Sequence, residues 1–194
     1  MTIFSKEEAR NRLKHYLPLL PEREEYETKI LKAAYPLLKN TTQVISYVAD
    51  RSLEVDILPL IESSPLPRPT QFWEYKHSAK WYFPKINAEN HLVFIRPLSW
   101  TKGKFGIWEP VGEDQITPEQ ADLVIVPALG FSEFGKRLGR GGGYYDRVLS
   151  DPILKEKTIG LTFSKFFPVP FSPDPHDCQV GKIITEVGVR SFLD

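Results

Sequence analysis

Apolar runs of strand length alternate along this chain with segments whose apolar residues have helical spacing. The strand-like runs cover residues 44–49, 80–85, 91–96, 123–126, 158–163, 183–187 and 188–190. Helices are predicted from the capping box at Ser5 to about Tyr16, from Pro21 to Asn40, and from Tyr144 to Leu149. The alternation predicts a layered α/β fold with a largely parallel sheet.

The segment 121–147 is the most informative part of the chain. Its apolar run 123–126 predicts a strand buried on both faces, and Pro127 ends the run. A loop follows that contains Lys136, Arg137 and Arg140 among six glycines, at positions 130, 135, 139, 141, 142 and 143. Because a helix is predicted to begin at Tyr144, the glycines would expose backbone N–H groups at a helix N-terminus. The pattern therefore indicates an anion-binding loop.

Two common phosphate-binding motifs do not fit this loop. Gly130 to Lys136 has the spacing of a P-loop, but Arg137 stands where the motif needs a hydroxyl. The dinucleotide fingerprint fails because Tyr144 occupies the position of its third glycine. A flexible loop with solvated charges is the remaining alternative on composition alone.

A second candidate lies after the strand at 44–49. Residues 50–52 are expected to turn the chain into a short helix that contains residues 54–57. In an open α/β sheet, ligands bind beyond the carboxyl ends of the strands, so Glu54 stands where a functional carboxylate is expected. A plain acid at a helix start explains Glu54 equally well.

Other segments give weaker signals. The runs 80–85 and 91–96 predict a hairpin or two adjacent edge strands, residues 64–69 a proline-rich connection, and residues 105–110 an ordered loop. Trp108 and Phe83 are candidates for an aromatic slot, although packing roles fit them as well. His15, His77 and His91 belong to no metal-spaced cluster and are interpreted as surface or structural residues.

Composition narrows the choice of partners. The 194 residues fit one domain, 1–194, and 25 basic residues balance 25 acidic ones, so small-molecule substrates are expected rather than nucleic acid or membrane. Cys178 is the single cysteine, which excludes an internal disulfide. With no signal-peptide pattern and no membrane-length apolar run, we expect a soluble, cytoplasmic monomer.

Several motifs together resemble the 5-formyltetrahydrofolate cyclo-ligase (methenyltetrahydrofolate synthetase) family. The most specific is RLGRGGGYYDR, from Arg137 to Arg147. The others occur in the family's order and are Lys6 with Arg10, the Glu-Val-Asp box at 54–56, Pro84-Lys85, the stretch 105–110, and His176-Asp177 followed by residues 184–186. The resemblance covers nearly the whole chain.

The resemblance implies a three-layer α/β/α fold with a mixed sheet, like that of the ribose-phosphate isomerase and CoA-transferase group. It also implies ATP-dependent conversion of 5-formyltetrahydrofolate to 5,10-methenyltetrahydrofolate, with release of ADP and phosphate. Magnesium (Mg²⁺) would accompany ATP, the co-substrate.

The resemblance also assigns residues to roles. The ATP-binding residues would be Lys6, Arg10, Arg137, Leu138, Gly139, Arg140, Gly141, Gly142, Gly143, Tyr144 and Tyr145. The folate-binding residues would be Glu54, Arg140, Gly141, Gly142, Gly143 and Tyr144, with Trp108 as a flat contact. Arg140, Tyr144 and Tyr145 would be catalytic, and Asp146 and Asp177 would hold the metal.

Three positions depart from the family's pattern. Ile57 stands in place of Thr, Phe166 in place of Gln, and Gly181 in place of Asp. They motivate an alternative, a non-catalytic folate- or nucleotide-binding protein on the same scaffold. Sugar-phosphate isomerase or CoA-transferase activity is a third hypothesis with little support, because fold does not fix function.

Overall fold

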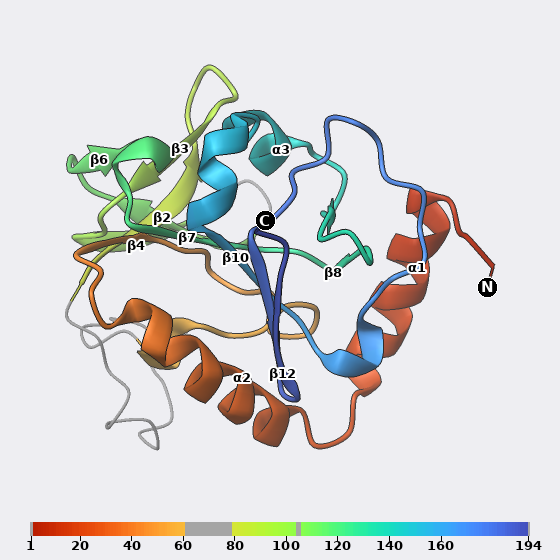
Figure 1. Ribbon diagram of the computed structural model, residues 1–194. Helices are drawn as coiled ribbons and strands as arrows, with labels where there is room; N and C mark the ends of the chain where they lie inside the picture. Colours follow the sequence, from red (N-terminus) through yellow and green to blue (C-terminus); the bar gives the residue numbers. More distant parts are fainter. Residues whose placement is uncertain (1, 61–78, 104–105, 194) are drawn as a thin grey trace.

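A central eight-stranded sheet organises the molecule (Figure 1). The computed structural model describes residues 2–60, 79–103 and 106–193. The strand order is β12-β11-β10-β7-β1-β2-β3-β6, and among these residues four neighbouring pairs are parallel and three are antiparallel. The strands are β1 (Gln43–Ile45), β2 (Lys80–Ile86), β3 (Leu92–Ile95), β6 (Gln115–Ile116), β7 (Leu123–Val126), β10 (Thr158–Leu161), β11 (Lys182–Thr185) and β12 (Gly188–Ser191). The predicted α/β fold with a largely parallel mixed sheet is confirmed.

Helices cover both faces of this sheet. Figure 1 shows α2 (Arg23–Leu38) below the sheet, and α3 (Tyr144–Val148) with the 3₁₀ helix η5 (Pro152–Lys157) above it. The helix α1 (Lys6–Tyr16) and the turn η1 (Leu17–Leu19) lie at one side. Short 3₁₀ turns also occur at η2 (Leu58–Leu60), η4 (Pro118–Gln120) and η6 (Ser164–Phe166).

The strand β7 is apolar throughout because it contributes to two cores. Leu123 and Ile125 pack in the core beside α1 and α2, whereas Val124 and Val126 pack in the opposite core with residues of α3 and η5. All four side chains are buried. Successive side chains of a strand point to opposite faces, so a central strand covered on both faces has no polar position.

The N-terminal helices follow the sequence closely. Ser5 accepts a hydrogen bond from the Glu8 backbone N–H and Glu8 bonds back to Ser5, which forms the predicted capping box of α1. The second helix begins at Arg23, two residues after the predicted Pro21, because Glu22 has a left-handed backbone conformation with φ 56°.

The short helix predicted over residues 54–57 is wrong. Leu53 and Glu54 donate backbone hydrogen bonds to the Asp50 carbonyl and close a turn, and the next regular turn is η2. Side chains occupy the carbonyls that a helix would use, since the Tyr47 hydroxyl donates to Val55 and Arg23 donates to Glu54. Tertiary hydrogen bonds therefore replace helical ones in this segment.

The strands β2 and β3 form the predicted hairpin inside the sheet, and a second hairpin was missed. β2 and β3 pair antiparallel, with the turn at residues 87–90 between them. The expected loop at 105–110 includes the strand β5 (Trp108–Val111), which pairs with β4 (Ser99–Lys102). Phe83 is buried and packs edge-on against Trp100, with ring centroids 5.0 Å apart, so the predicted slot of Phe83 and Trp108 is not formed.

At the C-terminal end, β11 and β12 form an antiparallel hairpin at the edge of the sheet. The run predicted at 158–163 contains β10, and residues 167–175 are irregular, as their prolines predict. The proline-rich connection at 64–69, Phe105 and His77 lie outside the described residues.

Gly160 of β10 leaves room for the ring of Phe131, which lies in β8 (Gly130–Phe131) beneath the glycine-rich loop. A Cβ atom at Gly160 would lie 2.2 Å from Phe131 Cζ. We therefore expect Gly160→Ala to lower the free energy of unfolding by about 1–3 kcal/mol, measured by urea denaturation. Phe131→Leu removes the clashing ring, so the double variant should lose less stability than the sum of the single losses. Strictly additive losses would contradict this packing.

Candidate functional site

The segment between β7 and α3 is ordered by strand pairing and is not an open loop. β8 pairs antiparallel with β9 (Arg137–Leu138), and the Leu129 N–H donates to the Leu138 carbonyl. Between β9 and the start of α3, two glycines have positive backbone φ angles, 109° at Gly141 and 65° at Gly143. Glycine adopts such conformations without steric cost. The glycines therefore allow the chain to reverse direction close to α3.

Arg137 holds this segment in place from inside. Its Nε donates to the Pro127 carbonyl at 2.7 Å, and its Nη1 lies 3.0 Å from both carboxylate oxygens of Asp146. Asp146 Oδ1 also accepts the backbone N–H of Cys178 at 3.2 Å. The Arg137 side chain is buried. The Arg137–Asp146 pair thus joins the end of β7, the helix α3 and the C-terminal segment.

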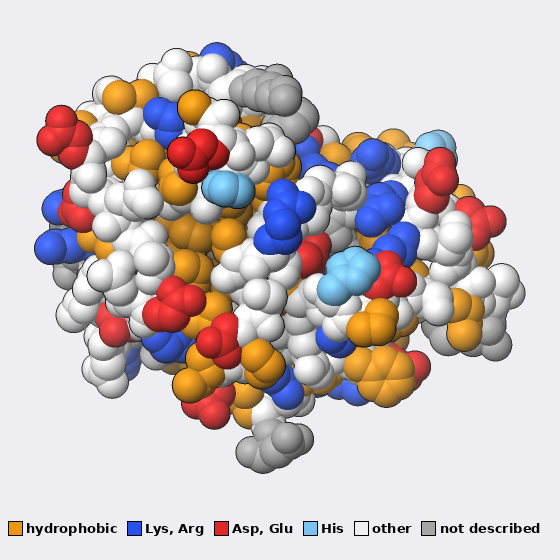
Figure 2. Space-filling view, turned by 90° about the horizontal axis from the view of Figure 1, so that it is seen from above, with side chains coloured by type: hydrophobic (Ala, Val, Ile, Leu, Met, Phe, Trp, Pro, Cys, Tyr) orange, Lys and Arg blue, Asp and Glu red, His pale blue; other side chains and the backbone are white. Residues whose placement is uncertain are grey.

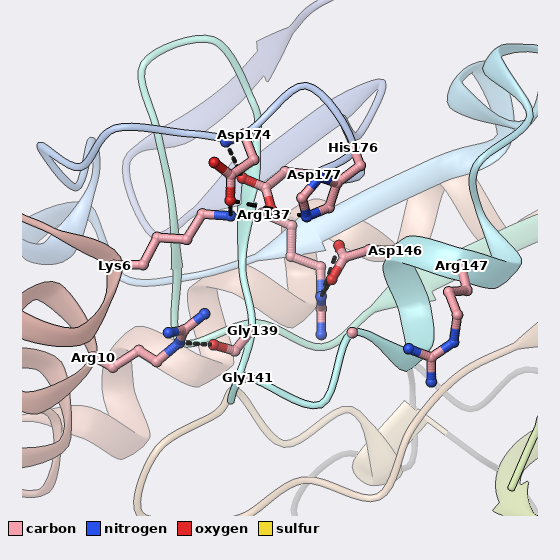
Figure 3. Close-up of a pocket in the computed structure, with 11 residues that line it drawn as sticks. Lys6, Arg10, Arg137, Gly139, Gly141, Asp146, Arg147, Asp174, His176 and Asp177 are labelled. Atoms are coloured by element: carbon pink, nitrogen blue, oxygen red, sulfur yellow. Dashed lines mark hydrogen bonds and ion pairs between the residues drawn. The ribbon is translucent and has the colours of Figure 1, made fainter.

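A cavity of about 430 Å³ opens beside this pair (Figure 3). Its lining consists of Lys6, Arg10, Arg137, Gly139, Gly141, Gly143, Asp146, Arg147, Asp174, His176 and Asp177. Arg10 Nε donates to the Gly139 carbonyl at 2.8 Å, so α1 contacts the glycine loop directly. The structure therefore brings Lys6 and Arg10 to the same cavity as Gly141.

Two acids neutralise Lys6. Its ammonium group lies 2.6 Å from Asp174 Oδ2 and 2.5 Å from Asp177 Oδ1. Burial alone would lower the pKa of Lys6, but the hydrogen bonds and charges of both carboxylates outweigh it and raise this pKa. The Asp174 N–H donates to Asp177 Oδ2 at 2.7 Å, which fixes the two acids in one turn. Lys6 is held firmly at the rim of the cavity.

Arg140 points to the end of β1 rather than into this cavity. Its Nη2 lies 3.1 Å from Glu54 Oε2 and 3.2 Å from Asp50 Oδ2. Burial raises the pKa of Glu54, and the Arg140 charge opposes that rise. Glu54 also accepts the Asp50 N–H at 2.9 Å. The loop and the carboxylate predicted to bind the two substrates are therefore directly connected.

The two tyrosines of the signature have different surroundings. The Tyr144 hydroxyl donates to Asn90 Oδ1 at 2.9 Å, and the Arg147 guanidinium lies 4.9 Å above its ring. Tyr145 is buried, its hydroxyl has no partner among the described residues, and burial raises its pKa strongly. Tyr144 is the more accessible of the two.

The remaining candidates, Gly142, Trp108 and Leu138, do not line the cavity. Trp108 is 37% exposed on β5, with Lys102 Nζ 4.6 Å from its ring centroid. Leu138 is buried in the core.

Sequence reasoning missed three lining residues, Asp174, His176 and Arg147. The signal for Asp174 was its spacing from Asp177, because acids three residues apart can face each other across a turn. Arg147 ends the signature, but the resemblance assigns it no role. The oxygen or nitrogen ligand atoms of Asp174, His176 and Asp177 lie within 4.8 Å of one another.

Comparison with known proteins identifies the family of this chain. The model of the 5-formyltetrahydrofolate cyclo-ligase family matches residues 71–186. The chain belongs to this family. Relatives named 5-formyltetrahydrofolate cyclo-ligase are 29% identical over 106 residues in Mus musculus and 31% over 104 residues in Mycoplasma pneumoniae. These matches cover 53% and 54% of this chain and 52% and 54% of the relatives, so the chain spans about half of their length.

Solved structures of the cyclo-ligase family match nearly the whole chain. The Aquifex aeolicus 5,10-methenyltetrahydrofolate synthetase has a TM-score of 0.73 and 28% identity, over 97% of this chain and 93% of that one. The Mycoplasma pneumoniae synthetase has a TM-score of 0.69 over 94% of this chain and 99% of that one; at 21% identity it supports the fold. None of the helices in the described part of the chain is long and apolar enough to cross a membrane.

The three departures from the cyclo-ligase pattern have local structural explanations. Ile57 is fully buried in the core beside α1 and α2. Gly181 has no space for a side chain, since a Cβ atom would lie 2.4 Å from the Lys155 carbonyl oxygen. Phe166 lines a separate cleft of about 250 Å³ between α1 and residues 165–170. None of the three residues lines the cationic cavity.

Removal of Arg137 should destabilise the protein, because it leaves the Asp146 carboxylate partly buried without its cation. We expect Arg137→Ala to lower the free energy of unfolding by about 3–5 kcal/mol in urea denaturation. Arg96→Ala is the matched control, because Arg96 and Asp114 form an exposed pair 3.8 Å apart. That change should cost about 1 kcal/mol or less. Equal losses in the two variants would show that the Arg137 pair has no special structural role.

Glu54→Gln should change how stability depends on pH. Because the pKa of Glu54 is raised above its ordinary value of 4.5, the folded state holds this proton more tightly than the unfolded chain. The contribution of Glu54 to the free energy of unfolding is complete below its ordinary pKa of 4.5, and it is lost as pH rises through the raised pKa. Urea denaturation from pH 4 to 8 should therefore show the glutamine variant gaining stability relative to wild type as pH rises.

Glu8→Gln provides a control of opposite sign for this measurement. Hydrogen bonds from Ser5 lower the pKa of Glu8, so its contribution is present above pH 4.5 and disappears as pH falls. If the difference in free energy of unfolding between Glu54→Gln and wild type did not change with pH, Glu54 would not be a buried carboxyl group with a raised pKa.

Proposed function

We propose that this chain is an ATP-dependent 5-formyltetrahydrofolate cyclo-ligase, which forms 5,10-methenyltetrahydrofolate, ADP and phosphate. The observation that carries the proposal is the meeting of α1 and the glycine loop at one cationic cavity, with Arg140 connecting that loop to Glu54. Family membership supports the reaction. The cavity supports a phosphate-bearing co-substrate, since cations and backbone amides bind anions.

The reaction needs an activated formyl group. A formamide oxygen is a poor leaving group, so N10 of the folate cannot close the ring until that oxygen has been phosphorylated. ATP supplies the phosphoryl group, and phosphate then leaves as the new C–N bond forms. Such a transfer depends on positioning and charge neutralisation more than on covalent participation by the protein.

The side chains of the cavity suit the nucleotide. In this proposal Lys6 and Arg10 neutralise phosphate charge from α1, and the chain from Arg137 to Tyr145 surrounds the nucleotide. Arg137 is already fixed by Asp146, so it contributes a positive charge of constant position. A rigid cation needs little reorganisation when phosphate charge develops.

The folate is proposed to contact Glu54 and the loop from Arg140 to Tyr144, with Trp108 at its edge. Arg140 is the proposed link between the substrates, because it touches Glu54 while Gly139 and Gly141 on either side of it line the cavity. We propose that Arg140, Tyr144 and Tyr145 act in the chemical step.

Magnesium fits the donor chemistry of the cavity. Asp146 and Asp177 both line it, and two carboxylates with phosphate oxygens are the ligands that Mg²⁺ prefers. When bound, the ion would neutralise charge on the phosphates. Asp146 and Asp177 now hold Arg137 and Lys6, so each carboxylate is fixed in orientation.

We further propose a single domain over 1–194 that works as a cytoplasmic monomer on small-molecule substrates. A surface of mixed charge favours small-molecule substrates over nucleic acid or an anionic membrane. Figure 2, which looks down on the molecule from the side of α3, shows basic and acidic side chains interspersed rather than separated. An Arabidopsis thaliana relative is named as mitochondrial, so localisation needs its own measurement.

The decisive experiment is an absorbance assay for methenyltetrahydrofolate with ATP, magnesium and 5-formyltetrahydrofolate. Formation of product only when all three are present would support the cyclo-ligase. Tight folate binding without turnover in well-folded protein would instead support the non-catalytic binding protein. ADP release without cyclisation would contradict the proposed mechanism.

Arg140→Ala should be severe in this assay. The change removes the proposed link between the nucleotide loop and the cation beside Glu54, so kcat/KM should fall by roughly 10²–10³-fold. Arg190→Ala is the matched control, since Arg190 stacks on Phe167 and Phe192 at the sheet edge. Its kcat/KM should equal that of wild type. An active Arg140→Ala enzyme would exclude a chemical role for this residue.

A further inference from the structure

The charges of the cavity are unevenly compensated. Four cationic side chains line it: Lys6, Arg10, Arg137 and Arg147. Lys6 is paired with Asp174 and Asp177, and Arg137 is paired with Asp146. Within the described ranges, no carboxylate lies within ion-pair distance of Arg10 or Arg147. These two arginines therefore carry the positive charge that an incoming anion would meet.

Arg147 is directed to the cavity by its place on α3. Its backbone N–H donates to the Gly143 carbonyl at 3.1 Å, while its side chain turns back along the helix. The guanidinium lies over the Tyr144 ring, and Nη1 donates to the Gly142 carbonyl at 3.3 Å. Figure 3 shows Arg147 and Arg10 on opposite sides of Gly141.

The glycines of the loop leave space for this arrangement. A Cβ atom at Gly142 would lie 2.9 Å from the Tyr144 ring, and one at Gly143 would lie 3.1 Å from Arg147 Nη1. Side chains at these positions would push the ring and the guanidinium away. The stacking on the Tyr144 ring also restricts the Arg147 side chain. A guanidinium that is already restricted loses less conformational freedom when it binds an anion.

We propose that Arg147 is a further phosphate-binding residue, which grips the polyphosphate of the co-substrate from the side opposite Arg10. This inference rests on the proposed function and extends it to a residue with no role assigned above. Among the described residues, the Arg147 guanidinium donates one long hydrogen bond, so most of its five N–H groups remain to bind phosphate oxygens.

The test uses inorganic tripolyphosphate in the presence of magnesium, which supplies the anion and its metal without adenine or folate. Heat unfolding of the full chain, titrated with this probe, gives an apparent dissociation constant. Loss of one charge-assisted contact should raise this constant about tenfold or more in Arg147→Ala. Arg147→Lys keeps the charge without the planar fork, so an intermediate value is expected.

Two further variants control for general charge and for folding. Arg12→Ala removes a cation from α1 that lines the separate cleft, and it should bind the probe as wild type does. Arg10→Ala should weaken binding like Arg147→Ala. Urea denaturation of each variant without the probe separates binding losses from folding losses. In the folate assay, Arg147→Ala should raise the KM for ATP more than it lowers kcat.

The outcomes distinguish this inference from the proposed function. Equal protection of wild type and Arg147→Ala by tripolyphosphate would overturn the inference and leave the cyclo-ligase proposal standing. If tripolyphosphate protects Arg147→Ala less than wild type, but wild type makes no methenyltetrahydrofolate, the result would support phosphate binding by Arg147 and reject the cyclo-ligase activity. Absence of any protection of wild type would overturn the inference.

Discussion

The buried pair of Arg137 and Asp146 is the interaction on which the arrangement of the site depends. Its guanidinium connects the Pro127 carbonyl at the end of β7 with α3, and its carboxylate partner accepts the N–H of Cys178. Burying two charges has a large desolvation cost, so a pair of this kind is weak evidence of stabilisation. Its value here is positional, because three segments far apart in sequence must meet for the pair to be satisfied.

Under the proposed function, the ion pairs of the cavity would have to exchange partners when magnesium and polyphosphate bind. The carboxylates proposed to hold magnesium are the ones that now neutralise Arg137 and Lys6. A complex of magnesium and polyphosphate brings a cation for the acids and an anion for the bases, so every charge keeps a partner of opposite sign. A polyphosphate without its metal would have to compete with the carboxylates for Lys6. Under the proposed function, the metal complex would therefore replace these ion pairs more readily than the polyphosphate alone.

The sequence predicted the parts of the site that rest on local patterns. The apolar run of β7, the capping box of α1 and the glycine-rich signature depend on neighbouring residues, and all three lie where expected. The helix expected near Glu54 failed because Tyr47 and Arg23 bind its carbonyls from elsewhere in the fold. Asp174 was missed for the same reason, since its partner Lys6 is 168 residues away. Partners that meet only through tertiary structure leave no periodic signal.

The origin of the positive field also differs from the sequence-based interpretation. A helix N-terminus was expected to favour phosphate, but α3 has only 5 residues, and few peptide dipoles are aligned in so short a helix. The field must therefore come from side chains and loop amides. The glycines therefore have a different structural role, because Gly142 and Gly143 leave space for the Tyr144 ring and the Arg147 guanidinium. A side chain at Gly142 would meet the Tyr144 ring, and one at Gly143 would meet the Arg147 guanidinium and would also have to adopt a φ of 65°.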